Sequence, residues 1–377
     1  MEGINSKRIL FVTSKPLYPI DGGDKLRAYM FVKYLSTKCK VHVVCPGTIS
    51  HSMDNVEFHE ITTRKYLIPI RLVDLLLKNL PIQLATLDYK RAWRVVGDIY
   101  RCEDLIVGHL YRGFFLVPEN LRPISFFEAC DNFYLAAKRI VFPKSLKSVV
   151  FKLDQAKVRK IEKSFLEISQ GVSYINIEDA EYYNIKDFVL ISNGVLDHCG
   201  VVKWSPSNRI LLFIGNMNTV PNRDAIDLFL RDNYEFLKKK GLILRVAGIG
   251  AHRYEKYDVV EAIGSYSSYE EVSSDVLCGI APMVNGVGVQ NKVLDYLVMA
   301  LPTLITDVAK SGIDLIDNEN CFVITRDSLQ AKIEYIQSLG NLEHIEQIRM
   351  KGRNTVLTKN SWEHEVDKLW RYWTSLV

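Results

Sequence analysis

Short apolar runs alternate with amphipathic stretches along most of the chain, and this alternation predicts an α/β fold. In the first half, brief β-branched runs bounded by turn residues predict strands at Arg8–Thr13, Val41–Cys45, Asp104–His109, Ile124–Glu128, Val172–Asn176 and Val189–Ser192. Helical patterns lie between them, as at Lys25–Leu35 and Leu146–Ile168. Strands that alternate with helices form parallel sheets with helices on both faces.

The same alternation starts again in the second half. Strands are predicted at Ile210–Gly215, Leu242–Gly248, Val276–Pro282, Pro302–Thr306 and Cys321–Thr325, and helices at Ala225–Lys239, Tyr269–Ser274, Asn291–Ala300, 327–338 and 342–357. We therefore predict two Rossmann-like domains that face each other across a cleft, at residues 1–192 and 209–360. The polar segment 193–208 is the expected linker. A C-terminal helix over 361–377, with tryptophans at helical spacing, is expected to cross back to the first domain.

Composition excludes several classes of protein. Hydrophobic residues make up 48% of the chain and charged residues 24%, which is typical of a globular protein and not of a disordered or fibrous one. No apolar run reaches the roughly 18 residues that a membrane-spanning helix needs, and the polar N-terminus predicts no signal peptide. The seven cysteines are scattered without a CxxC pair, so we expect reduced thiols in a cytoplasmic protein.

The net charge of +4 is unevenly distributed. Residues 1–190 carry 28 basic and 21 acidic side chains, whereas the rest of the chain carries 20 and 23. The excess is concentrated at 64–95 and 143–163, each with seven basic and two acidic residues. A basic half is compatible with nucleic acid, an anionic membrane or a phosphate-bearing ligand, and charge alone does not select one of them.

Open parallel sheets bind ligands at the carboxyl ends of their strands, which directs attention to the loop after the first strand. Gly22 and Gly23 lack Cβ atoms there and allow a ligand close to the backbone. Lys25 and Arg27 follow at the start of a helix, where the dipole disfavours cations unless an anion is bound. The alternative is an ordinary loop with solvated charges. The segment is not GxGxxG, so the nicotinamide fingerprint is absent.

A second glycine loop precedes the helix that begins near Asn291. Its amides and Lys292 suit a diphosphate, and Asp295, one turn later, could accept hydrogen bonds from a ribose unless it is simply a polar residue on a half-exposed helix. A third candidate is His109 at the end of a strand, although a lone histidine is usually structural. A fourth is the turn after Gly215 and Asn216, whose amides could approach a donor phosphate.

Several well-known sites are absent from the sequence. The chain contains no Asp-x-Asp pair that would bridge a divalent cation to a diphosphate, so no metal is expected. It also lacks Gly-x-Ser-x-Gly, His-Glu-x-x-His and GxxxxGK[ST]. No arginine-rich tract or RNA-recognition signature supports a nucleic-acid partner.

Four motifs in this order and spacing carry a family resemblance: Gly23–Arg27, Asn193–Val195, Gly215–Met217 with Pro221-Asn222, and Gly288–Asp295. Together they resemble the family 4 retaining glycosyltransferases of the GT-B fold, of the kind found in bacterial exopolysaccharide and O-antigen clusters. The resemblance implies a nucleotide-sugar donor bound by the second domain, an acceptor bound by the first, retention of anomeric configuration and no metal requirement.

The resemblance also implies roles for particular residues. The loop at Gly22 and Gly23 would approach the diphosphate or the donor sugar. Backbone groups of 288–290 would meet sugar and phosphate, and Asp295 stands where the family holds the ribose. The donor-binding set is thus Gly22, Gly23, Lys25, Gly215, Asn216, Gly288, Val289, Gln290, Asn291 and Asp295, and the catalytic set is His109, Lys292 and Arg27.

Two departures from the family pattern leave alternatives open. Val287 stands where the family has the first Glu of its Glu-x7-Glu motif, and Asn216 and Met217 replace its Gly-Arg pattern. The sequence therefore predicts a metal-independent hexosyltransferase that moves a sugar, from UDP by default, to a lipid-linked or growing surface glycan. The alternatives are a non-catalytic subunit that partners another transferase and, ranked lower, a nucleotide-sugar epimerase.

Two basic and apolar stretches, Tyr66–Trp93 and Ile140–Phe165, suit a peripheral contact with the cytoplasmic surface of the inner membrane. A polyprenyl-linked acceptor would require such a contact. Solvated helix faces over a packed core are the alternative explanation for both stretches.

Overall fold

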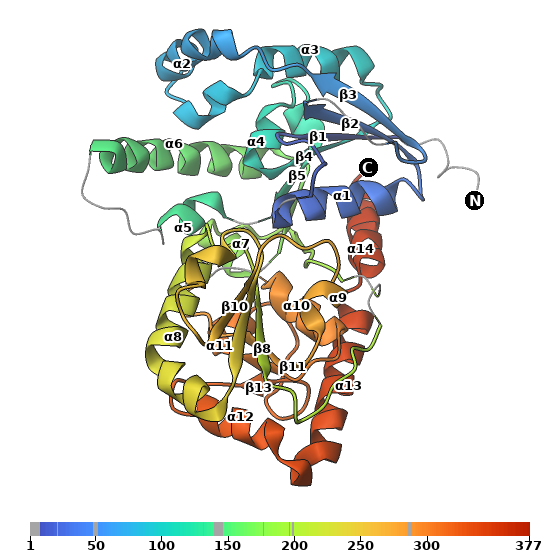
Figure 1. The fold of residues 1–377 in the computed structure, drawn as a ribbon. Coiled ribbons are helices and arrows are strands. Elements are labelled where there is room, and N and C mark those ends of the chain that lie inside the picture. Colours follow the sequence, from blue (N-terminus) through green and yellow to red (C-terminus); the bar gives the residue numbers. More distant parts are fainter. Residues whose placement is uncertain are drawn as a thin grey trace. The chain divides into compact units, whose positions relative to one another are not determined.

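The computed structural model describes residues 8–20, 22–47, 52–130, 132–138, 146–175, 177–195, 197, 200–285 and 289–377. The chain divides into two compact units (Figure 1). Unit 1 comprises Met1–Ser192 and Trp362–Val377, and unit 2 comprises Asn193–Ser361. The segment 193–208, expected as a linker, is thus part of unit 2.

Unit 1 is built on a parallel sheet which, in the described residues, has seven strands in the order β3-β2-β1-β4-β5-β6-β7. The strands are β1 Arg8–Thr13, β2 Lys40–Pro46, β3 Val56–Ile61, β4 Leu105–His109, β5 Ser125–Cys130, β6 Gly171–Tyr174 and β7 Val189–Leu190. The helices are α1 Gly23–Leu35, α2 Ile68–Leu77, α3 Tyr89–Ile99, α4 Leu110–Phe115, α5 Phe133–Lys138, α6 Leu146–Ile168, α7 Ile177–Tyr182 and α14 Trp362–Ser375. Short 3₁₀ turns lie at Lys65–Leu67, Ile82–Thr86 and Arg122–Ile124.

The C-terminal helix α14 belongs to unit 1, as the sequence predicts (Figure 1). It packs beside α1, where the rings of Phe31 and Trp362 meet edge to face with centroids 6.1 Å apart. Trp373 is buried against Phe126 of β5. The apolar stripe of the last helix is therefore part of the core of the unit formed by the first half of the chain.

Unit 2 repeats the architecture with a second parallel sheet, whose order in the described residues is β10-β9-β8-β11-β12-β13. The strands are β8 Ile210–Ile214, β9 Ile243–Ala247, β10 Val260–Ile263, β11 Val276–Ala281, β12 Thr303–Ile305 and β13 Phe322–Val323. The helices are α8 Val220–Lys240, α9 Glu270–Ser273, α10 Asn291–Val298, α11 Asp307–Lys310, α12 Leu329–Gln337 and α13 Leu342–Lys359, with 3₁₀ turns at Ala251–Tyr254 and Leu339–Asn341. Two Rossmann-like units confirm the predicted fold class.

The structure differs from the predicted elements at the edges of the sheets. The strand pattern missed β3 and β10, which both lie at a sheet edge; β3 carries three polar residues among six, and β10 is only four residues long. Helix α8 begins five residues earlier than predicted, with Pro221 in its first turn, where the missing N–H costs no hydrogen bond. Among the described residues, no helix is both long enough and apolar enough to span a lipid bilayer.

Candidate functional site

The strand order of each sheet fixes where a ligand would bind. In unit 1 the first strand, β1, lies between β2 and β4, and in unit 2 β8 lies between β9 and β11. At such a position the connections that follow two neighbouring strands run toward opposite sides of the sheet. The loops at the carboxyl ends of these strands therefore separate and leave space for a ligand. Apart from Gly288, which lies outside the described residues, the residues predicted for binding and catalysis lie at the end of β4, in the loops after β1, β8 and β11, or on α1 and α10.

In unit 2, Lys292 lies in the first turn of α10 with its ammonium group buried. The side chain is 8% exposed and lies over the ring of Phe213. Its Nζ donates to Oδ1 of Asn222 at 3.0 Å and to Oε1 of Gln290 at 3.2 Å, which are both neutral acceptors. Burial lowers the pKa of Lys292 to about 8, although the charge of Asp295 acts in the opposite direction. A buried cation with neutral partners at a helix N-terminus is stabilised by a bound anion.

Asn222 connects Lys292 to the loop after β8. While its Oδ1 accepts from Lys292, its Nδ2 donates to the carbonyl oxygen of Asn216 at 3.0 Å. A Cβ on Gly215 would lie 2.7 Å from that Nδ2, so only glycine permits the close approach. The structure thus brings together Gly215, Asn216 and Lys292, which the sequence placed in separate candidate loops.

The start of α10 is fixed from several directions. Asn291 accepts a hydrogen bond at 2.8 Å from Asn193, and Val289 is buried. Gln290 is the N-cap residue, and no side chain caps the N-terminus of this helix. Its first amides are therefore suited to an anionic group. Gly288, expected to bind the donor, lies outside the described residues, as does the neighbouring pair 286–287.

Asp295 is half-buried one turn after Asn291. Burial raises its pKa to about 6, while a hydrogen bond from Tyr269 and the charge of Lys292 act in the opposite direction. Residues three apart on a helix lie on one face, so Lys292 and Asp295 present a cation and a hydrogen-bond acceptor on the same side of α10.

In unit 1, Glu128 connects two of the predicted catalytic residues. Its buried Oε1 accepts from Nε and Nη2 of Arg27 at 3.0 and 2.9 Å, and its Oε2 lies 2.5 Å from Nδ1 of His109. Burial alone would raise the pKa of Glu128, but the attraction of Arg27 and His109 lowers it below its usual value. Arg27 also donates to the carbonyl oxygens of Ile191 and Ser192, so its guanidinium is occupied within the unit.

His109 in turn lies beneath the start of α1. Its ring is buried, and Nε2 lies 3.2 Å from the carbonyl oxygen of Asp24. The hollow lined by Lys15, Asp24 and His109 has no room even for a water molecule. Above it, Gly22 and Gly23 are exposed at the beginning of the helix. His109 therefore supports the helix start from within, and these two glycines form the surface that a ligand would meet.

The backbone beside these residues is strained. Leu110, directly after His109, has a φ of +60°, and Cys130, at the end of the strand that carries Glu128, has a φ of +65°. Side chains other than glycine rarely adopt this left-handed region, and such strain concentrates at functional sites. Both strained residues lie at the carboxyl edge of the sheet, where the topology places a ligand.

Sequence reasoning missed two residues that connect this arrangement. Glu128 ends a predicted strand, a position that could have identified it. Asn222 lies within one of the motifs that carry the family resemblance. Lys25, predicted to bind the donor, donates from its ammonium group to the carbonyl oxygen of Pro19 at 3.1 Å.

One cluster in the described residues has side chains that could ligate a metal ion: His42, Glu57 and His59, on β2 and β3. Nη1 of Arg8 lies 3.2 Å from Nε2 of His42, and Nδ1 of His42 lies 2.9 Å from Nε2 of His59. Because a guanidinium only donates, His42 Nε2 accepts and His42 Nδ1 donates to His59. Both ring nitrogens of His42 and the Nε2 lone pair of His59 are thus already used in a hydrogen-bonded chain.

We compared the sequence and the structure with those of known proteins. Residues 208–341 match the family model described as glycosyl transferases group 1. The sequence matches none of the curated proteins with which it was compared.

Solved structures match over nearly the whole chain. Sucrose-phosphate synthase from Thermosynechococcus elongatus has a TM-score of 0.68 at 13% identity and covers 98% of both chains. HepE from Anabaena, in complex with UDP-glucose, has a TM-score of 0.66 at 11% identity over 98% of this chain and 99% of that one. A variant of TarM from S. aureus, in complex with Fondaparinux, α-GlcNAc-glycerol and UDP, has a TM-score of 0.69 at 12% identity over 97% and 99%. The chain therefore has the fold of the GT-B glycosyltransferases, and the part that matches the glycosyl transferases group 1 model lies within its second unit.

Proposed function

We propose that the protein is a retaining, metal-independent hexosyltransferase that moves a sugar from a nucleotide diphosphate to a lipid-linked or growing surface glycan of the O-antigen or exopolysaccharide type. The observation that carries this proposal is Lys292, a buried ammonium with neutral partners at an uncapped helix start in the domain that matches the transferase family. UDP is the proposed nucleotide, in line with the UDP and UDP-glucose complexes of TarM and HepE.

In this proposal the second unit binds the donor. Lys292 and the first amides of α10 stabilise the negative charge that develops on the departing diphosphate, which is the part a metal ion plays in other transferases. Asn222 holds the ammonium in place through its 3.0 Å hydrogen bond. Asp295 accepts hydrogen bonds from the ribose, and backbone groups of Val289 and Gln290 meet the sugar and phosphate. Retention of configuration follows from the family resemblance.

The first unit binds the acceptor. Gly22, Gly23 and the start of α1 form the part of this unit that meets the reacting sugar. Because Arg27 and Glu128 are fully buried, we assign them as positioning residues: they hold His109, and His109 supports the backbone at Asp24.

The acceptor side is also proposed to contact the cytoplasmic surface of the membrane through α2. Ile70, Val73 and Leu77 of this helix are 66%, 56% and 82% exposed, and Lys78 and Lys90 flank them. Exposed apolar side chains beside basic ones favour the interface of an anionic leaflet. In the second basic stretch, residues 139–145 and the side chains to 151 lie outside the described part of the chain, so this proposal is based on α2.

Thermal unfolding with millimolar UDP, GDP, CDP, ADP or dTDP tests the donor site. A ligand at about 100 times its dissociation constant stabilises a protein by about 2.7 kcal/mol. We expect a rise with one nucleotide, lost in Lys292→Ala and kept in Lys239→Ala, which removes an exposed lysine of the same unit. No rise with any of the five contradicts the transferase proposal.

Turnover then separates an enzyme from a non-catalytic subunit. Hydrolysis or transfer from the radiolabelled nucleotide-sugar, absent in Lys292→Ala, supports catalysis. Nucleotide binding without turnover on any acceptor would favour the non-catalytic subunit suggested by Val287, which lies outside the described residues.

A further inference from the structure

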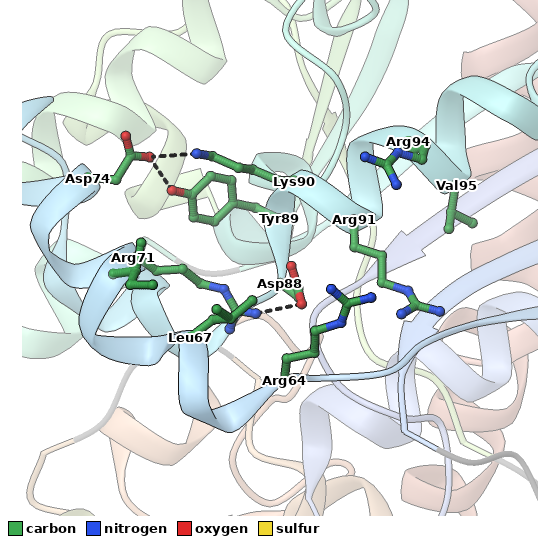
Figure 2. A pocket seen from close by; sticks show the side chains of 11 residues that line it. Arg64, Leu67, Arg71, Asp74, Asp88, Tyr89, Lys90, Arg91, Arg94 and Val95 are labelled. Atoms are coloured by element: carbon green, nitrogen blue, oxygen red, sulfur yellow. Dashed lines mark hydrogen bonds and ion pairs between the residues drawn. The ribbon is translucent and has the colours of Figure 1, made fainter.

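Unit 1 contains a cavity, separate from the hollow beside His109, whose lining is mainly basic. It has a volume of about 440 Å³ and lies between α2 and α3, as Figure 2 shows. Five of its lining side chains are basic and two are acidic: Arg64, Arg71, Lys90, Arg91 and Arg94 against Asp74 and Asp88. We call these seven residues and the space between them the arginine pocket. None of them was predicted as a site residue.

The two carboxylates of the arginine pocket are already occupied. Asp88 lies 2.5 Å from Nη2 of Arg71. Asp74 accepts a hydrogen bond from Tyr89 and forms ion pairs with Lys78 and Lys90. The acidic groups are therefore not free to neutralise further arginines.

Arg71 itself is not satisfied by this partner. The side chain is 6% exposed, its contact with Asp88 is poorly aligned for a hydrogen bond, and its Nη1 has no hydrogen-bond partner among the described residues. Buried donors almost always have a partner, so an orphaned one indicates a missing ligand or water. A guanidinium offers a planar pair of donors that fits the oxygens of a phosphate.

Three further arginines add uncompensated charge. Arg64, Arg91 and Arg94 form no ion pair or side-chain hydrogen bond with any residue that the structure describes. Figure 2 shows the side chains of Arg64 and Arg71 directed toward the region around Asp88. Single exposed arginines are common, but several that line one cavity with a buried, unsatisfied guanidinium form a site for an anion.

The arginine pocket lies next to a smaller cavity at the carboxyl edge of the sheet. Asp88 also lines a smaller cavity of about 150 Å³, which Ser14 lines as well. Ser14 in turn lines the hollow beside His109. Because Ser14 directly follows β1, these neighbouring cavities place the arginine pocket near the end of the sheet at which β1 ends, where we propose that the acceptor reacts.

We infer that the arginine pocket binds a phosphate-type oxoanion carried by the acceptor. The charge and the unsatisfied Arg71 select the anion, and the position of the pocket near the carboxyl end of β1 assigns the anion to the acceptor; this second step rests on the proposed function. The phosphate could belong to a lipid headgroup embedded in the membrane or to a soluble phosphorylated glycan.

Calorimetric titration of the full chain with inorganic phosphate and pyrophosphate, at constant ionic strength, tests the inference. A Lys292→Met background removes the ammonium of the second unit. In the double variant Arg64→Gln/Arg91→Gln we expect pyrophosphate affinity to fall at least about tenfold, because two charged donors are lost. The control Arg101→Gln/Arg371→Gln removes two exposed arginines of the same unit outside the pocket and should change affinity less than about twofold.

Vesicles distinguish the two sources of phosphate. Sedimentation with phosphatidylglycerol in phosphatidylcholine, lost in the pocket variant and kept in the control, assigns a lipid headgroup. Pyrophosphate binding that depends on the pocket, with equal sedimentation of both variants, assigns a soluble ligand. If both variants bind pyrophosphate and vesicles alike, or the background chain binds neither, the inference is overturned. UDP stabilisation, measured on the chain with Lys292 intact, tests the proposed function separately.

Discussion

Lys292 has an environment that opposes folding and favours a ligand. Its ordinary pKa of 10.5 falls to about 8 because the ammonium group is buried, which corresponds to a cost of about 3 kcal/mol at neutral pH. Neither Asn222 nor Gln290 carries a charge to offset this cost. A bound anion would offset the cost of the buried ammonium, so we expect Lys292 to bind one.

Lys292→Met should therefore stabilise the chain in the absence of ligand. Met retains most of the apolar contact and removes the buried charge, so we expect the free energy of unfolding to rise by about 1–3 kcal/mol. The same variant should lose the stabilisation by UDP. Urea unfolding with and without UDP measures both effects. A variant that is destabilised but still binds UDP would show that Lys292 has a structural role only.

The pH dependence of nucleotide binding provides a second test of Lys292. The folded-state pKa of about 8 lies below the ordinary 10.5, so the ammonium form is complete at pH 7 and is lost as pH rises through 8. Since the diphosphate binds the charged form, affinity for UDP should fall about tenfold between pH 7 and pH 9. Without ligand the sign is opposite: the destabilisation due to the buried charge decreases as pH rises from 8 toward 10.5.

Calorimetry at several pH values, in buffers of different ionisation enthalpy, measures this dependence. Proton uptake on UDP binding near pH 8 is expected for the natural chain, and none is expected for Lys292→Met. A flat affinity between pH 7 and pH 9 contradicts the assignment of the diphosphate to this lysine.

At the scale of elements, Glu128 joins α1, β4 and β5. Removing one partner of a buried ion pair leaves the other charge unpaired, which costs about 3–5 kcal/mol. We expect Glu128→Gln to destabilise unit 1 by about this amount, because Arg27 would lose the buried carboxylate with which it forms an ion pair at 2.9 Å.

The double variant Arg27→Met/Glu128→Leu serves as its control. It removes both charges and should recover a large part of the loss. Chemical denaturation gives the stabilities, and UDP binding to unit 2 should stay unchanged in both variants. Equal stability of Glu128→Gln and the natural chain would exclude the positioning role.

The pattern of the sequence predicted the central strands and the edge strands β7 and β13, but it missed the edge strands β3 and β10. β1, β4 and β5 are buried on both faces and appear as continuous apolar runs. β3, with the sequence VEFHEI, alternates polar and apolar residues as an edge strand does, and the pattern did not distinguish it from a loop. A buried strand is recognised by its apolar run, whereas a strand with few buried residues, such as β3, has a local sequence that also fits a loop.

The candidate site was predictable only where it is local in sequence. Lys292, Asn291 and Asp295 lie in one helix, and a strand–loop–helix pattern identified them. Arg27 and Glu128 are 101 residues apart, and only the folded sheet brings them together. The arginine pocket was visible as a basic stretch at 64–95, but the sequence did not indicate that one of its arginines is buried and unsatisfied.

At the scale of the whole molecule, each compact unit has its own sheet and its own core. The sixteen residues Trp362–Val377 belong to unit 1 although they follow unit 2 in the chain. Gln170 donates to the carbonyl oxygen of Leu376, and the backbone amide of Val172 donates to the hydroxyl of Tyr372 at 3.3 Å. The last helix thus contributes to the stability of the proposed acceptor unit.

Trp373→Ala should consequently act on one unit only. Trp373 is buried against Phe126, and replacing a buried tryptophan by alanine costs about 3–5 kcal/mol. Calorimetric unfolding should show one transition moved to lower temperature, and UDP should raise the other transition as much as in the natural chain. The control Trp370→Ala changes a tryptophan of the same helix that is only partly buried, and should cost less. If UDP stabilisation is lost together with the packing of Trp373, the nucleotide does not bind to unit 2 alone, and the assignment of donor binding to that unit is wrong.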